Sequence, residues 1–140
     1  MGKGFESKTI ISKPIDEVWS YISDFNNADK WMTGVTDLRP KEPGSICKGS
    51  KLFFQSRGSE RESEITAWEP LKMMELTSTQ AGVTATYAYS LKSMGDKTEL
   101  KLNAGCIATG FWKILHPIII IAMRASDSKH PVQIKNAIEG

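Results

Sequence analysis

The chain is 140 residues long, and its 18 basic and 16 acidic residues leave a net charge of +2. This length predicts one domain over residues 1–140, and the spread of charge lends no support to nucleic-acid binding, which leaves a basic patch or stripe. The N-terminus lacks the apolar stretch of a signal peptide and the two cysteines have no CxxC spacing, so we expect a cytoplasmic protein with reduced thiols.

The first part of the sequence predicts a strand followed by two short helices. Residues 5–11 alternate loosely in polarity and form the expected first strand. Pro14 suits the first position of a helix. The apolar stripe of this helix consists of Val18, Trp19, Ile22 and Phe25. A second short helix or turn is expected over residues 28–32, with Trp31 facing inward.

The middle of the sequence predicts six further strands. We expect them at residues 35–39, 51–57, 60–68, 72–78, 83–92 and 98–106. In the strand at 60–68 the glutamates point outward, and the same parity turns Arg61 inward and Trp68 outward. Strands that are polar on one side favour an antiparallel sheet with one face in water.

The C-terminal segment, residues 109–139, predicts one long helix. Its first half, up to Met123, is apolar on almost every side, so it should be buried on almost every side. The apolar run 111–123 is too short for a bilayer, which takes about 20 apolar residues. Pro131 would be interior and should kink or break the helix. A long apolar helix gripped by a curved sheet is a container for an apolar small molecule.

Three stretches of the sequence carry a family pattern. They are Ile11-Ser12-Lys13-Pro14 with the following Val18-Trp19, residues 65–70 before Met74-Glu75-Leu76, and residues 95–100 before a proline-containing final helix. In this order they resemble the polyketide cyclase/dehydrase and lipid-transport family of the START-like (SRPBCC) superfamily. The resemblance implies an α+β helix-grip fold, in which a curved antiparallel sheet of about seven strands wraps a long C-terminal helix and two short helices follow the first strand. Members of the superfamily bind apolar molecules between sheet and helix, and some catalyse cyclisation or dehydration there.

No catalytic constellation stands out in the sequence. The two histidines, His116 and His130, both lie in the predicted final helix about 21 Å apart, too far for one metal or one triad. Because HExxH, CxxC, GxGxxG and P-loop patterns are missing, we expect no cofactor and no metal. Enzyme activity stays open, since an inward Tyr87, Tyr89 or Arg61 is able to act as an acid or polarise a carbonyl.

We therefore expect the protein to bind a small apolar ligand, lipid- or polyketide-like, between the sheet and the final helix without catalysis. The alternatives are a polyketide cyclase/dehydratase-type enzyme and a protein-binding module akin to chaperone-activating members of the superfamily. We expect no nucleic acid and no membrane span, and a monomer or homodimer. The predicted ligand-binding side chains turn toward the container. They are Trp31, Phe54, Arg61, Met74, Tyr87, Tyr89, Leu102, Ile119 and Met123.

Overall fold

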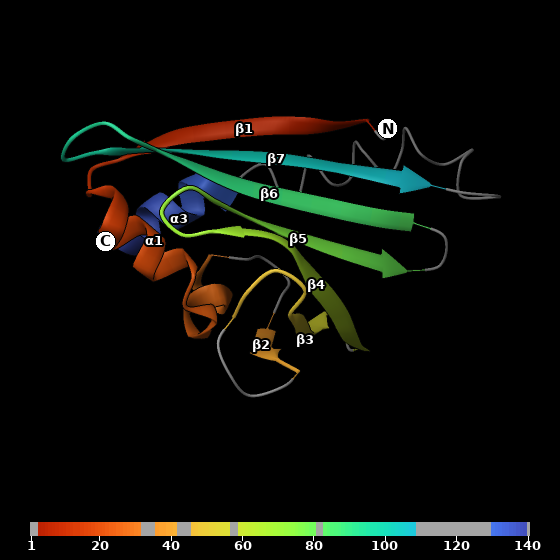
Figure 1. The fold of residues 1–140 in the computed structure, drawn as a ribbon. Helices are drawn as coiled ribbons and strands as arrows, with labels where there is room; N and C mark the ends of the chain where they lie inside the picture. Colours follow the sequence, from red (N-terminus) through yellow and green to blue (C-terminus); the bar gives the residue numbers. More distant parts are fainter. Residues whose placement is uncertain are drawn as a thin grey trace.

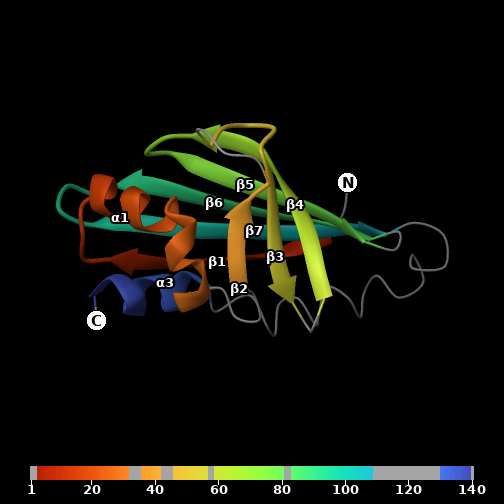
Figure 2. The same ribbon diagram turned by 90° about the horizontal axis from the view of Figure 1, so that it is seen from below.

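A computed structural model describes residues 3–31, 36–41, 46–56, 59–80, 83–108 and 130–139 of the chain. These residues form a seven-stranded antiparallel sheet in the order β1-β7-β6-β5-β4-β3-β2 (Figure 1). The strands are β1 (Lys3–Ile11), β2 (Thr36–Pro40), β3 (Lys51–Ser56), β4 (Ser59–Glu69), β5 (Met73–Gln80), β6 (Val83–Ser93) and β7 (Thr98–Ala108). The helices are α1 (Ile15–Ile22), the 3₁₀ helix η1 (Phe25–Lys30) and α3 (His130–Glu139). The sheet is curved, and all three helices lie on one side of it, at one end (Figure 2).

The longest regular pairing in the sheet joins β6 to β7. The two strands pair without interruption from Val83 opposite Ala108 to Ser93 opposite Thr98. The turn between them uses Gly95, whose φ of +78° lies in the left-handed region that favours glycine. Alternation then sends apolar side chains to the face that the helices cover and polar ones to water, as the sequence predicted.

Two short helices follow β1, as expected, but their boundaries differ from the predicted ones. Pro14 is the N-cap of α1, with an extended backbone, and so lies one position before the helix. The second helix, η1, begins at Phe25 instead of residue 28. Asn27 explains the earlier start, because its backbone N–H donates to the Asp24 carbonyl at 2.9 Å and its side-chain amide donates to the Tyr21 carbonyl at 3.2 Å. These bonds turn the chain as soon as α1 ends.

A β-bulge in β4 corrects the prediction for Trp68. The register of β4 against β5 shifts between Ile65 and Ala67, which makes Thr66 an extra residue and reverses the alternation beyond it. Trp68 therefore pairs with Met74 on the covered face instead of pointing outward. Its ring centroid lies 5.1 Å from that of Trp19 and 6.3 Å from that of Phe25, so Trp68 packs against the core while remaining half-buried.

The predicted C-terminal helix is described only at its end. Residues 109–129 lie outside the described residues, and α3 covers His130–Glu139. Pro131 is the second described residue of α3, and the residues before His130, which decide whether it is interior to a longer helix, lie outside the described residues. Ile134 of α3 is fully buried in the core. No helix in the described part of the chain is long and apolar enough to cross a membrane.

Candidate functional site

The covered face of the sheet, called the inner face below, is built from rows of side chains that cross the strands. One row consists of Trp68, Met74, Tyr89, Leu102 and Ser7, which are successive cross-strand partners. The next row consists of Ile65, Leu76, Tyr87, Ala104 and Phe5. Each row runs from β4 through β5, β6 and β7 to β1, because paired residues of antiparallel strands share a face. The fold thus gathers apolar residues from distant parts of the chain on one surface.

Four of the predicted ligand-binding residues meet at the end of this face that the helices cover. Trp31 directly follows η1, and its ring stands edge-on to that of Tyr89 with the centroids 5.3 Å apart. Met74 and Leu102 are the cross-strand neighbours of Tyr89 on either side. All four side chains are at most 1% exposed. They form one tightly packed group, which we call the Trp31 cluster.

The other predicted residues within the described strands lie away from the Trp31 cluster. Phe54 of β3 and Arg61 of β4 are cross-strand partners, and both are half-buried. Tyr87 lies in the second row, and like Phe54 it packs against the core while remaining half-buried. These three half-buried residues are called the Arg61 end below; Tyr87 is its member nearest the Trp31 cluster, because its row crosses β4 at Ile65, four residues from Arg61. Ile119 and Met123 lie outside the described residues.

The glutamates on the outer face of β4 form ion pairs, whereas Arg61 points to the inner face. Glu60 pairs with Arg39, which also pairs with Asp37. Lys41 pairs with Glu62 at 3.4 Å, and Lys51 pairs with Glu64 at 2.6 Å. Arg61 alternates with these glutamates in the sequence and so has the opposite parity. Within the described ranges, no carboxylate pairs with it.

The buried serine and threonine hydroxyl groups of the inner face form hydrogen bonds to backbone carbonyls. Ser63 Oγ donates to the Thr77 carbonyl at 3.3 Å, and Thr98 Oγ1 donates to the Lys13 carbonyl at 2.8 Å. Burial raises the pKa of the Cys106 thiol on the inner face, which disfavours its reactive thiolate form. Among the described residues, no group of three or more His, Cys, Asp or Glu side chains is placed to hold a metal ion.

The inner face is therefore largely apolar with few polar groups; most of it is buried core, and Phe54, Trp68 and Tyr87 are its half-buried aromatic residues. Its aromatic and aliphatic rows suit an apolar molecule, and such surfaces with a small number of polar groups are typical of small-molecule sites. Arg61 brings five N–H donors to an oxygen-bearing group. Trp68 joins this face although its sequence parity pointed outward, because nothing in the local sequence marks the bulge at Thr66.

The sheet order and the position of the helices define a helix-grip-like class of proteins. The di-domain ARO/CYC protein BexL, from the BE-7585A biosynthetic pathway, has a TM-score of 0.81 at 13% identity over 98% of this chain. The chain spans 46% of the length of BexL. The ZhuI aromatase/cyclase from Streptomyces sp. R1128 has a TM-score of 0.76 at 10% identity, covering 99% of this chain and 94% of its own. The polyketide_cyc-like protein Cgl2372 from Corynebacterium glutamicum has a TM-score of 0.69 at 20% identity, covering 99% and 94%. At these identities the likeness establishes the fold.

The sequence itself establishes the family. Residues 4–110 match the family described as polyketide cyclase / dehydrase and lipid transport. Because the match covers most of the chain, the protein belongs to this family, and the resemblance seen in the sequence motifs is confirmed. Among curated proteins, none matches the chain in sequence.

Proposed function

We propose that the protein binds a small apolar ligand on the inner face of the sheet and releases it unchanged. The observation that carries this proposal is that Phe54, Arg61 and Tyr87 stay half-buried on that face, beside a core of buried, mostly apolar rows. Membership in a family of polyketide cyclases, dehydrases and lipid-transport proteins supports it. Lipid- or polyketide-like molecules are the ligands of matching chemistry.

Within the proposed site, the two ends of the inner face have different roles. The Trp31 cluster is already filled by its own side chains, so it serves as the wall against which a ligand rests. The ligand itself lies nearer the Arg61 end, against Phe54 and Tyr87, whose side chains are half-buried. Ile119 and Met123 belong to the proposed site on their sequence pattern alone.

Arg61 gives the proposed ligand a polar end. A half-buried guanidinium that lacks an ion-pair partner within the described residues favours a ligand carrying a carbonyl or carboxylate oxygen. The same observation favours a second candidate function, in which Arg61 polarises a carbonyl and Tyr87 acts as an acid in a cyclase or dehydratase. The two functions differ in whether the bound molecule is changed.

A binding titration with a matched pair of variants tests the proposal. An apolar dye that fluoresces on leaving water is titrated into the protein, and a lipid-like carboxylic acid is then used to displace it. Phe54→Ala should weaken binding about tenfold, because a buried aromatic side chain contributes about 1.5–3 kcal/mol. Phe53→Ala is the control, since Phe53 lies next in sequence but on the outer face, beside Arg39 and Lys41.

The possible outcomes distinguish ligand binding from catalysis, and some of them would contradict one or the other. A folded protein that binds no apolar probe contradicts the proposal, as does an equal loss in both phenylalanine variants. Turnover of a polyketide-like substrate, lost in Tyr87→Phe or Arg61→Leu without loss of folding, would replace the carrier by the enzyme. Full turnover in both variants would remove these residues from the mechanism.

A further inference from the structure

The two edges of the sheet are built differently. The β2 edge is five residues long, its register against β3 shifts between Thr36 and Arg39, and it ends in Pro40. Asp37 within it has a φ of +56°, in the left-handed region. Irregularities and prolines of this kind prevent another strand from adding to an edge.

Over the residues that the structure describes, the β1 edge has neither a bulge nor a proline. It is nine residues long and pairs with β7 at every position, from Lys3 opposite Cys106 to Ile11 opposite Thr98, without a bulge. A long, regular edge strand presents main-chain groups on which another strand is able to form. Helix α3 lies beside the Ile11 end of β1, and the strand extends past it toward Lys3 (Figure 2).

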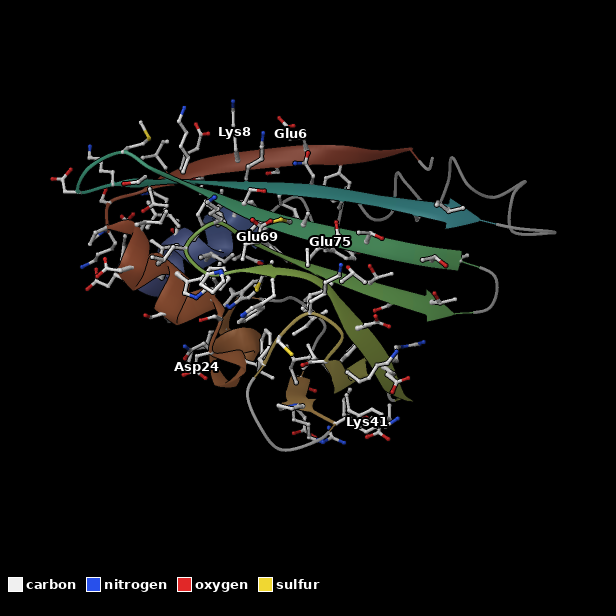
Figure 3. The ribbon with its side chains drawn as sticks, viewed as in Figure 1. Glu6, Lys8, Asp24, Lys41, Glu69 and Glu75 are labelled. Atoms are coloured by element: carbon white, nitrogen blue, oxygen red, sulfur yellow. The ribbon has the colours of Figure 1, made fainter. Side chains whose placement is uncertain are left out.

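The outer face of β1 carries one acidic and one basic side chain. Glu6 and Lys8 stand side by side on it and point away from the sheet (Figure 3). Lys8 is the cross-strand partner of Lys101 in β7, and like charges placed directly opposite each other destabilise a sheet. No carboxylate in the described segments forms an ion pair with Lys8.

We propose that two copies of the chain pair through their β1 edges, antiparallel to each other about a two-fold axis at Ser7. In this register Glu6 lies opposite the partner's Lys8, and Lys8 lies opposite the partner's Glu6. Each Lys8 gains a carboxylate on the side away from Lys101. The surface is self-complementary, as a two-fold interface requires.

The charges also select this register over its neighbours. A slip of two residues in one direction places Glu6 against the partner's Glu6, and in the other direction it places Lys8 against the partner's Lys8. A slip of one residue turns the side chains of the two strands to opposite faces. Only the register centred on Ser7 joins opposite charges. It also brings Ile10, which is 38% exposed, opposite the partner's Gly4.

The extent of the edge sets the expected strength of the dimer. A typical stable interface buries roughly 800 Å² on each partner. A single nine-residue edge strand on each copy provides a narrower contact than such an interface. We therefore expect a dimer that forms as concentration rises, in rapid exchange with the monomer. Added salt should weaken it, because the Glu6–Lys8 pairs are exposed to solvent.

Sedimentation of the full chain over a wide range of concentration tests the proposal. Wild-type protein should shift from monomer toward dimer, and Lys8→Glu or Glu6→Lys should weaken dimerisation by about tenfold or more, because two attractive cross-strand pairs become repulsive. The double variant, with both charges reversed, should restore it. Lys97→Glu is the control, because Lys97 lies exposed in the β6–β7 turn.

Two results would overturn the pairing through β1. One is a wild-type chain that stays monomeric at its highest soluble concentration. The other is a dimer that both single reversals leave unchanged, or that the double variant does not restore. Circular dichroism confirms that each variant is folded. If a reversal does not fold, Lys8→Gln replaces it, with a smaller loss expected because one attraction is removed and no repulsion is added.

Discussion

The two ends of the inner face differ in how completely they are enclosed. At the Trp31 cluster, η1 and the sheet enclose side chains that are at most 1% exposed. At the Arg61 end, the aromatic side chains of β3 and β6 are half-buried, and the charged side chain of Arg61 faces the same way. The chain thus combines a closed core and a less enclosed, more polar surface on one sheet.

This difference separates stability from recognition. A side chain that is fully buried contributes its whole transfer free energy, and it leaves a cavity when it is shortened. A half-buried side chain contributes less to the free energy of unfolding and keeps part of its surface for another molecule. We therefore expect mutations at the Trp31 cluster to act mainly on folding and those at the Arg61 end to act mainly on binding.

The largest effect is expected from a charge placed in the buried core at the end of the sheet that the helices cover. Ile134→Asp puts an unpaired carboxylate at a fully buried position of α3, and it should lower the free energy of unfolding by more than about 3 kcal/mol or unfold the protein. Val132→Asp is the matched control on the same helix, since Val132 is 47% exposed and the change should cost little. Thermal melting of both variants checks this. Equal melting temperatures would show that α3 does not close the core.

A second pair of variants compares the two ends directly. Met74→Ala at the Trp31 cluster should lower the free energy of unfolding by about 2–4 kcal/mol, through lost burial and the cavity that remains. Phe54→Ala at the Arg61 end should cost less than half as much, although it removes the larger side chain. Urea denaturation measures both values. Equal or reversed losses would contradict the separation of stability from recognition.

The sequence predicted the strands, their order along the chain and the inward rows, because alternation with period two is set by the pleat itself. It failed at Trp68, because the bulge at Thr66 depends on pairing with β5 and leaves no local pattern. It placed the start of η1 too late, because the amide of Asn27 reaches a carbonyl of the preceding helix.

The candidate site was less predictable than the fold. The polarity pattern predicted both Tyr87 and Tyr89 as inward ligand-binding residues, because both lie on the inward side of the same strand. Only the packing of Trp31 against Tyr89 shows that one tyrosine is enclosed and the other half-buried. The alternation of Arg61 with glutamates predicted that it points inward. The ion pairs of those glutamates could not be predicted, because they depend on where β2 and β3 lie beside β4.

A moderate effect is expected from removing a buried hydroxyl that bonds β7 to the segment between β1 and α1. Thr98→Val removes the hydrogen bond to the Lys13 carbonyl and leaves that acceptor unsatisfied, so unfolding should become easier by about 1–3 kcal/mol. Thr79→Val is the control at the other end of the sheet, because Thr79 is exposed and bonds only to the Thr84 hydroxyl in the described structure. Chemical denaturation of the two variants should show a loss for Thr98 alone.

The smallest expected effect depends on pH at the end of α3. Hydrogen bonds from Lys135 and from the backbone N–H of Ser12 lower the pKa of Glu139 below its ordinary value of 4.5. The folded state therefore holds this carboxylate ionised more firmly than the unfolded chain does. The resulting stability is complete above pH 4.5 and is lost as the pH falls through the lowered pKa.

Comparing wild-type protein with Glu139→Gln over a range of pH measures this contribution. At neutral pH the wild type should melt slightly higher, and the two melting curves should converge in acid, where Glu139 is protonated and resembles glutamine. Lys135→Gln should remove part of the same difference, because Lys135 is the largest cause of the lowered pKa. A difference that stays constant with pH would mean that Glu139 acts through packing instead of charge. The fastening of α3 to the segment after β1 would then not depend on pH.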